Sequence, residues 1–138
     1  MKRFLIVIVA LVALACLLLG WSTFGDRSSF RTGLDRHEGV PSTASDIAVY
    51  QCKNLNATFV ADFRIAERDF VAFAAEKGWV LEPITSTVSI FQAEAFRKRP
   101  PKGVSDGLSY SKREDNGGGV AAGYDRKTGR GYINRFSH

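Results

Sequence analysis

The sequence predicts an α+β protein with an N-terminal transmembrane helix, followed by a small antiparallel sheet with one main helix packed on one face (β-β-α-β-…-β-β-β). Three observations lead to this fold class. An apolar run opens the chain, several later segments alternate apolar and polar residues as strands do, and one segment repeats its apolar residues as a helix does. We expect a membrane anchor or signal segment over residues 1–21, a flexible linker over 22–44 and a small α+β domain over 45–138.

The apolar run is Phe4–Trp21, which carries no charge and follows the basic residues Lys2 and Arg3. A helix of this length spans roughly 27 Å, close to the hydrocarbon thickness of a bilayer. The two basic residues favour a cytoplasmic N-terminus. The run therefore predicts a single-pass signal-anchor in a bacterial inner membrane, with the C-terminal domain outside the cytoplasm.

Two alternatives stay open for the same run. Cleavage of a signal peptide after small residues, at Ala13-Leu14-Ala15 or Gly20-Trp21-Ser22, would release a secreted or periplasmic protein. Lipidation of Cys16 would produce a lipoprotein. All three interpretations place residues 22–138 outside the cytoplasm.

The clearest helix in the chain is Glu67–Lys77. Its residues Phe70 and Phe73 belong to one apolar stripe with helical spacing. Gly78 is expected to take the left-handed conformation that ends the helix, which would let Trp79 fold back toward Phe73. The stripe is interpreted as core.

Strand patterns recur through the domain, either as strict alternation or as runs of β-branched and aromatic residues. The first two segments are expected to form one hairpin, and the last two, joined by a turn with Gly129, another. Residues 85–96 favour a strand that passes into a short helical turn. The predicted strands are Ile47–Cys52, Thr58–Ile65, Trp79–Ile84, Gly107–Lys112, Val120–Asp125 and Gly131–Phe136.

Positive charge is concentrated in the last third of the chain. The whole chain has a formal net charge of +5, whereas Arg97–His138 has 10 basic and 4 acidic residues, which gives 10 − 4 = +6. An exported basic surface would suit an acidic protein, a lipid or an acidic envelope polymer, but not nucleic acid, which an exported domain rarely meets. The candidate contacts for such a partner are Arg97, Lys98, Arg99, Lys102, Arg126, Lys127 and Arg130.

Several pieces of the domain follow one another in a recognisable order: Thr43–Asp46, Asp69–Ala74, Gly78-Trp79, Asp106–Ser111 and Gly123–Tyr132. With these pieces, which cover most of residues 43–136, the chain resembles small uncharacterised bacterial proteins that are exported or membrane-anchored. The resemblance implies export. It carries no activity, cofactor or catalytic residue to transfer.

The domain offers no acid, base or nucleophile in a catalytic arrangement. His37 falls in the expected linker and His138 is at the end of the sequence, so we expect neither to serve as the base of a Ser-His or Cys-His pair. Cys52 stands alone in the domain and is expected to be buried, and no cofactor or metal motif occurs. We expect a non-catalytic, membrane-tethered, extracytoplasmic binding domain; the alternatives are a cell-envelope enzyme, an enzyme inhibitor or immunity-type protein, and an envelope structural protein without a ligand.

Overall fold

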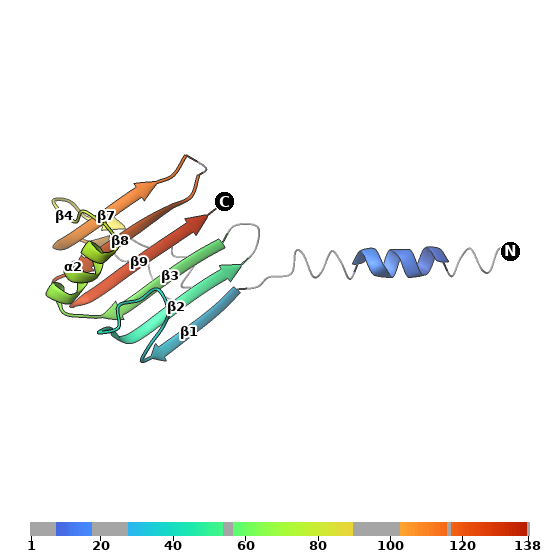
Figure 1. Cartoon of the computed structure of the whole chain (residues 1–138), viewed down its shortest axis with the longest axis horizontal. Helices are drawn as coiled ribbons and strands as arrows, with labels where there is room; N and C mark the ends of the chain where they lie inside the picture. The colour runs from blue at the N-terminus through green and yellow to red at the C-terminus, as the bar shows by residue number, and fades with distance from the viewer. Residues whose placement is uncertain (1–7, 18–27, 54–56, 90–102, 116, 138) are drawn as a thin grey trace.

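The computed structural model describes residues 8–17, 28–53, 57–89, 103–115 and 117–137. Its centre is a seven-stranded sheet in the order β1-β2-β3-β9-β8-β7-β4, in which every neighbouring pair is antiparallel (Figure 1). Strands β5 and β6 form a second, two-stranded sheet. The strands are β1 (Ser28–Leu34), β2 (Ser45–Lys53), β3 (Ala57–Arg64), β4 (Glu82–Pro83), β5 (Val88–Ser89), β6 (Gly103–Val104), β7 (Gly107–Arg113), β8 (Gly119–Asp125) and β9 (Arg130–Ser137).

The predicted α+β class is wrong, because the described chain is mostly sheet and contains few helices. The helix that packs on the sheet, α2 (Glu67–Glu76), has 10 residues and is outweighed by the seven strands beside it. The strand predicted over Trp79–Ile84 is shorter than expected, since β4 pairs through Glu82 and Pro83. Part of residues 85–96, including the expected helical turn, lies outside the described residues.

The predicted transmembrane helix over Phe4–Trp21 is corrected as well. In the described part of this run, residues 8–17 are helical, which corresponds to about 15 Å, half the hydrocarbon thickness of a bilayer. Within the residues that the structure describes, no helix is both long enough and apolar enough to cross a membrane. This finding overturns the single-pass, signal-anchor placement in the inner membrane. Hydropathy reports how apolar a run is, but not how many of its residues form one helix.

The stretch expected to be a flexible linker contributes an edge strand. β1 lies within residues 22–44 and pairs with β2, so that Ser28 lies opposite Cys52 and Arg31 opposite Val49. The register shifts between Arg31 and Leu34, where Gly33 has a φ of +68°. Most side chains of β1 are exposed on both faces, so its sequence lacks the alternation by which a half-buried strand is recognised.

Helix α2 begins at Glu67, as the sequence predicts, and its last residue is Glu76, one before the predicted Lys77. Gly78 has a φ of +69°, and the backbone N–H of Trp79 donates to the carbonyl of Ala74 at 2.9 Å. The ring of Trp79 turns back onto Phe73, with the two rings edge to face and their centroids 5.6 Å apart. The end of this helix therefore fixes where Trp79 lies on the sheet.

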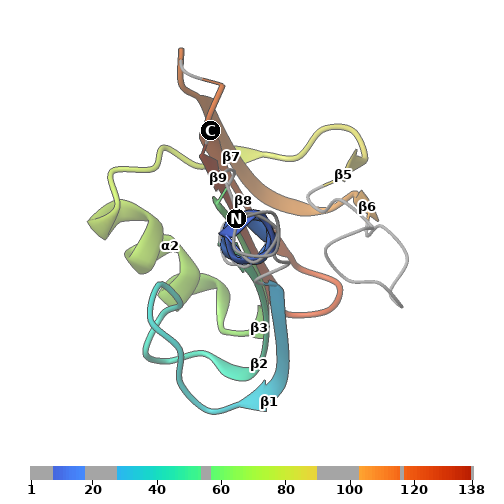
Figure 2. The same cartoon turned by 90° about the vertical axis from the view of Figure 1, so that its right-hand side faces the viewer.

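The main core lies between α2 and one face of the large sheet, whereas β5 and β6 lie on the opposite face (Figure 2). On the helix face, the rings of Phe63, Phe70 and Tyr124 lie near one another, all of them buried. On the opposite face, Val104 of β6 packs near Tyr132 in a smaller apolar cluster. Both faces of the sheet are thus partly covered, and α2 covers only one end of its own face.

Candidate binding site

The basic residues that the sequence singled out fall into two groups. Arg97, Lys98, Arg99 and Lys102 lie outside the described residues. Arg126, Lys127 and Arg130 belong to the turn between β8 and β9 or to its edge, and all three side chains contact an acceptor within the protein.

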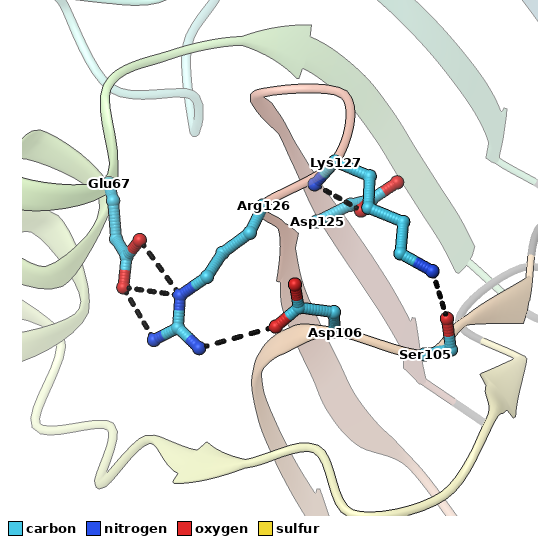
Figure 3. Close-up of polar contacts among 6 residues, drawn as sticks. All are labelled: Glu67, Ser105, Asp106, Asp125, Arg126 and Lys127. Carbon is cyan, nitrogen blue, oxygen red and sulfur yellow. Dashed lines mark hydrogen bonds and ion pairs between the residues drawn. The ribbon is translucent and has the colours of Figure 1, made fainter.

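Arg126 joins the hairpin to the start of α2 (Figure 3). Its guanidinium donates three hydrogen bonds to the carboxylate of Glu67, at distances between 2.7 and 3.1 Å, and one of 3.4 Å to Asp106. Beside it, the Lys127 ammonium donates to the hydroxyl of Ser105 at 3.1 Å, while the backbone N–H of Lys127 donates to Asp125 at 2.9 Å. These contacts hold the turn to its surroundings.

Arg130 is the most enclosed of the three. Its Nε donates to the carboxylate of Asp62, and its Nη1 donates to the carboxylate of Asp46 at 2.7 Å. The side chain of Arg130 is 11% exposed and that of Asp62 is 2% exposed, so this pair is removed from solvent. Arg130 therefore ties β9 to β3 and to the start of β2.

The contact between Arg126 and Glu67 predicts a pH effect. The hydrogen bonds from Arg126 are the main cause that lowers the pKa of Glu67 below its ordinary value of 4.5, with a smaller opposing effect of burial. A carboxylate with a lowered pKa stabilises the fold above its unfolded pKa and loses this contribution as the pH falls through the lowered value. In Arg126→Gln, an NMR titration of the Glu67 carboxyl should show its pKa rising toward 4.5; an unchanged pKa would contradict the assignment.

A groove of a different kind lies on the α2 face of the sheet, at the end that the helix leaves uncovered. In Figure 1, α2 lies over the end where β9 begins, and the groove residues belong to the other end, where β2 and β9 finish and β3 starts. The cavity measures about 540 Å³. We call this space and the residues that line it the Arg135 groove. The lining includes Lys53, Phe59, Lys77, Trp79, Val120 and Arg135.

Strand register brings the floor of the Arg135 groove together. Arg135 of β9 lies directly opposite Phe59 of β3 on one side and Val120 of β8 on the other. Directly opposite residues of antiparallel strands have their side chains on the same face. Trp79 does not come from a strand of this floor. It reaches the groove because α2 stops at Glu76 and the chain then folds back.

Arg135 is the central side chain of this groove. Its guanidinium carbon lies over the ring of Phe59, 5.7 Å from the centroid, and over the ring of Trp79, 5.8 Å from the centroid. In the described part of the chain, no side-chain or backbone oxygen accepts a hydrogen bond from Arg135. Burial without an acidic partner lowers the pKa of Arg135 from its ordinary value.

The rings of Phe59 and Trp79 each contact a further ring, so that a row of planar side chains crosses the sheet. Trp79 stacks on Tyr110 of β7 with an interplanar angle of 13° and a centroid distance of 5.6 Å. At the other end, Phe59 meets the ring of His37 at 5.6 Å. The N–H groups of a guanidinium lie in its own plane, so Arg135 can donate to a partner only along that plane. Those N–H groups form a fork that matches a carboxylate or a phosphate.

Sequence reasoning missed Arg135, although a signal for it was present. The predicted strand Gly131–Phe136 places Ile133 and Arg135 on the same face, and Ile133 is fully buried. A basic residue in phase with a buried apolar residue points toward the core side of a sheet. What the sequence could not provide was the pair of rings beside it, which come from β3 and from the segment after α2.

The remaining functional expectations concern cysteine and metals. Cys52 is partly buried and contributes to the edge of the groove. Among the described residues, no group of three histidine, cysteine or acidic side chains is arranged to hold a metal ion. The predicted absence of catalytic residues stays a prediction.

Fold and groove together define the class: an antiparallel β protein with a short helix over one end of a sheet face and a cation-bearing groove at the other end. Comparisons with protein families, with curated proteins and with solved structures find no match to this chain.

Proposed function

We propose that this protein is a non-catalytic binding domain that takes an anionic ligand in the Arg135 groove. The observation that carries the proposal is the guanidinium of Arg135, which is partly buried between two aromatic rings and has no acceptor among the described residues. The exposed Arg126 and the enclosed Arg130 differ from it, since both have carboxylates in contact.

The partial burial of Arg135 withdraws its cation partly from water. Burying a charged group without a hydrogen-bonding partner is unfavourable, and a ligand that supplies the missing acceptor recovers part of that cost on binding. The aromatic neighbours compensate the cation only partly, through the negative faces of their rings. A ligand oxygen in the plane of the guanidinium would complete its coordination.

The charges around the cavity favour the same sign of ligand. Lys53, Lys77 and Arg135 line it together with one carboxylate, that of Glu114, so the lining carries 3 − 1 = +2. Lysine side chains at the rim of a cavity attract an anion over a range of about one Debye length, roughly 8 Å at physiological salt. Of the basic residues in the last third of the chain, Arg135 lines this groove.

The test is to titrate the full chain with small anions of different chemistry: acetate, benzoate, octanoate and inorganic phosphate. Binding is measured by calorimetry, and the Nε–Hε resonance of Arg135 is followed by NMR. At least one anion should bind and shift that resonance. Replacing Arg135 by Gln should weaken its binding by about tenfold or more, as expected for the loss of a charge-assisted hydrogen bond.

Arg31→Gln is the matched control, because Arg31 is an exposed arginine on β1 that does not line the groove, and its loss removes the same charge. It should leave the affinity within about twofold. Urea unfolding of both variants shows whether either loses its fold. The proposal is overturned if none of the anions binds, or if Arg31→Gln weakens binding as much as Arg135→Gln.

A further inference from the structure

The walls of the Arg135 groove are largely apolar. Phe59, Trp79, Val120 and Phe136 all line the cavity, and none of them is fully exposed. A volume of about 540 Å³ lies within the range typical of sites for small organic ligands. An acetate-sized anion would contact Arg135 and leave most of this apolar surface in water. The size and the apolar walls of the groove therefore favour a ligand that carries an apolar part as well as an anionic group.

The groove offers few donors for a phosphate. Its one partly buried cation is the guanidinium of Arg135, whereas Lys53 and Lys77 are exposed, and the Lys77 ammonium lies over the ring of Phe73 at 5.5 Å. Phosphate sites usually combine several backbone N–H groups with the positive N-terminal end of a helix. Neither feature is contributed by the groove residues described above.

The helix end that borders the groove has the opposite polarity. Lys77 and Trp79, which line the cavity, follow directly on the last turn of α2, so the C-terminal end of the helix dipole, which is partially negative, lies at this wall. The carboxylate of Glu114 adds a negative charge to the lining. Both disfavour a doubly charged phosphate more than a singly charged carboxylate, because the repulsion grows with the charge of the ligand.

Building on the proposed function, we infer that the ligand is an apolar monocarboxylate, such as a medium-chain fatty acid or an arylalkanoic acid. Its carboxylate takes the in-plane N–H groups of Arg135, and its hydrocarbon part lies along Val120 and the neighbouring aromatic side chains. Each buried methylene adds to the affinity through removal of apolar surface from water. The carboxylate sets the position of the ligand, and the hydrocarbon supplies most of the affinity.

The experiment compares five probes on the full chain by calorimetry: acetate, butyrate, octanoate, octyl phosphate and the neutral octanamide. Affinity should rise from acetate through butyrate to octanoate, with octanoate about tenfold tighter than acetate or more. Octanoate should also bind about tenfold more tightly than octyl phosphate, because the phosphate carries more negative charge. It should bind about tenfold more tightly than octanamide, because the neutral amide lacks the charged contact with Arg135.

A cavity-filling variant tests where the hydrocarbon lies. Val120→Phe should weaken the binding of octanoate by about tenfold and change the affinity for acetate by no more than about twofold. The added ring occupies apolar space and leaves Arg135 in place. Val80→Phe is the matched control, because Val80 is 76% exposed and does not line the groove. If Val120→Phe does not fold, the chain-length series on the natural sequence still decides the question.

The outcomes separate this inference from the proposed function. Tighter binding of octyl phosphate than of octanoate, or equal affinity for acetate and octanoate, overturns the monocarboxylate and leaves an anion site at Arg135. Equal affinity for octanamide and octanoate overturns both, because no anion is then required. Failure of every anionic probe to bind also overturns both.

Discussion

Asp62→Ala should destabilise the protein by about 3–5 kcal/mol, the usual loss when one partner of a buried ion pair is removed. Asp62 is 1% exposed, in the middle of β3, and its carboxylate accepts the Nε–H of Arg130. Without it, the enclosed guanidinium of Arg130 keeps, among the residues that the structure describes, its contacts with Asp46, whose side chain is 62% exposed. The remaining charge would be buried with an incomplete set of acceptors. Urea unfolding followed by circular dichroism measures the loss.

Asp106→Ala is the matched control for this prediction. Asp106 also contacts an arginine, Arg126, but both side chains are substantially exposed, at 51% and 42%. An exposed ion pair contributes at most about 1 kcal/mol, so this variant should remain close to the natural protein in stability. If Asp62→Ala costs no more than Asp106→Ala, the buried pair does not hold β3 and β9 together as argued.

Phe70→Ala should cost a similar amount, about 3–5 kcal/mol, through a cavity under α2. The side chain of Phe70 is fully buried, and its ring lies 5.6 Å from that of Tyr124 and 6.5 Å from that of Phe63. The space that it fills is shaped by Gly131, where an added Cβ would come within 3.0 Å of the Phe70 ring. Because the backbone of β9 approaches so closely, the site has little freedom to collapse around a missing ring.

Val71→Ala, at the next position of the helix, is the control. Val71 is 41% exposed and points away from the sheet face, so its truncation should change the free energy of unfolding by less than about 0.5 kcal/mol. Both variants keep helix propensity high, which leaves burial as the difference between them. Equal losses at the two positions would show that α2 does not pack through Phe70.

Local sequence predicted the elements whose pattern is strong. The stripe that includes Phe70 and Phe73 predicted α2, and the recurrence of apolar residues at every second position, as at Phe59 and Ala61, predicted β3. Each of these elements turns a regularly spaced set of apolar residues toward the main core, and that spacing can be read from the sequence. β1 gave no such signal because most of its side chains are exposed on both faces, and it was therefore expected to be part of a linker.

The roles of the arginines could not be read in the same way. Arg126, Arg130 and Arg135 look alike in sequence, as basic residues in or beside the last hairpin. The structure gives Arg126 a partner from the start of α2, gives Arg130 partners from β2 and β3, and leaves Arg135 between two rings. The sequence-based choice of Arg126 and Arg130 as contacts for an anionic partner rested on net charge, which counts these residues without locating their neighbours.

What the sequence determined by itself was local: the helix and its end at Gly78, the alternating strands, and the concentration of positive charge toward the C-terminus. Tertiary structure alone decided the seven-strand order and the position of the Arg135 groove. The physical reason is that periodicity depends on neighbours a few residues apart. The groove instead depends on register between β3, β9 and β8, which joins Phe59 to Arg135 and Arg135 to Val120 across long stretches of chain.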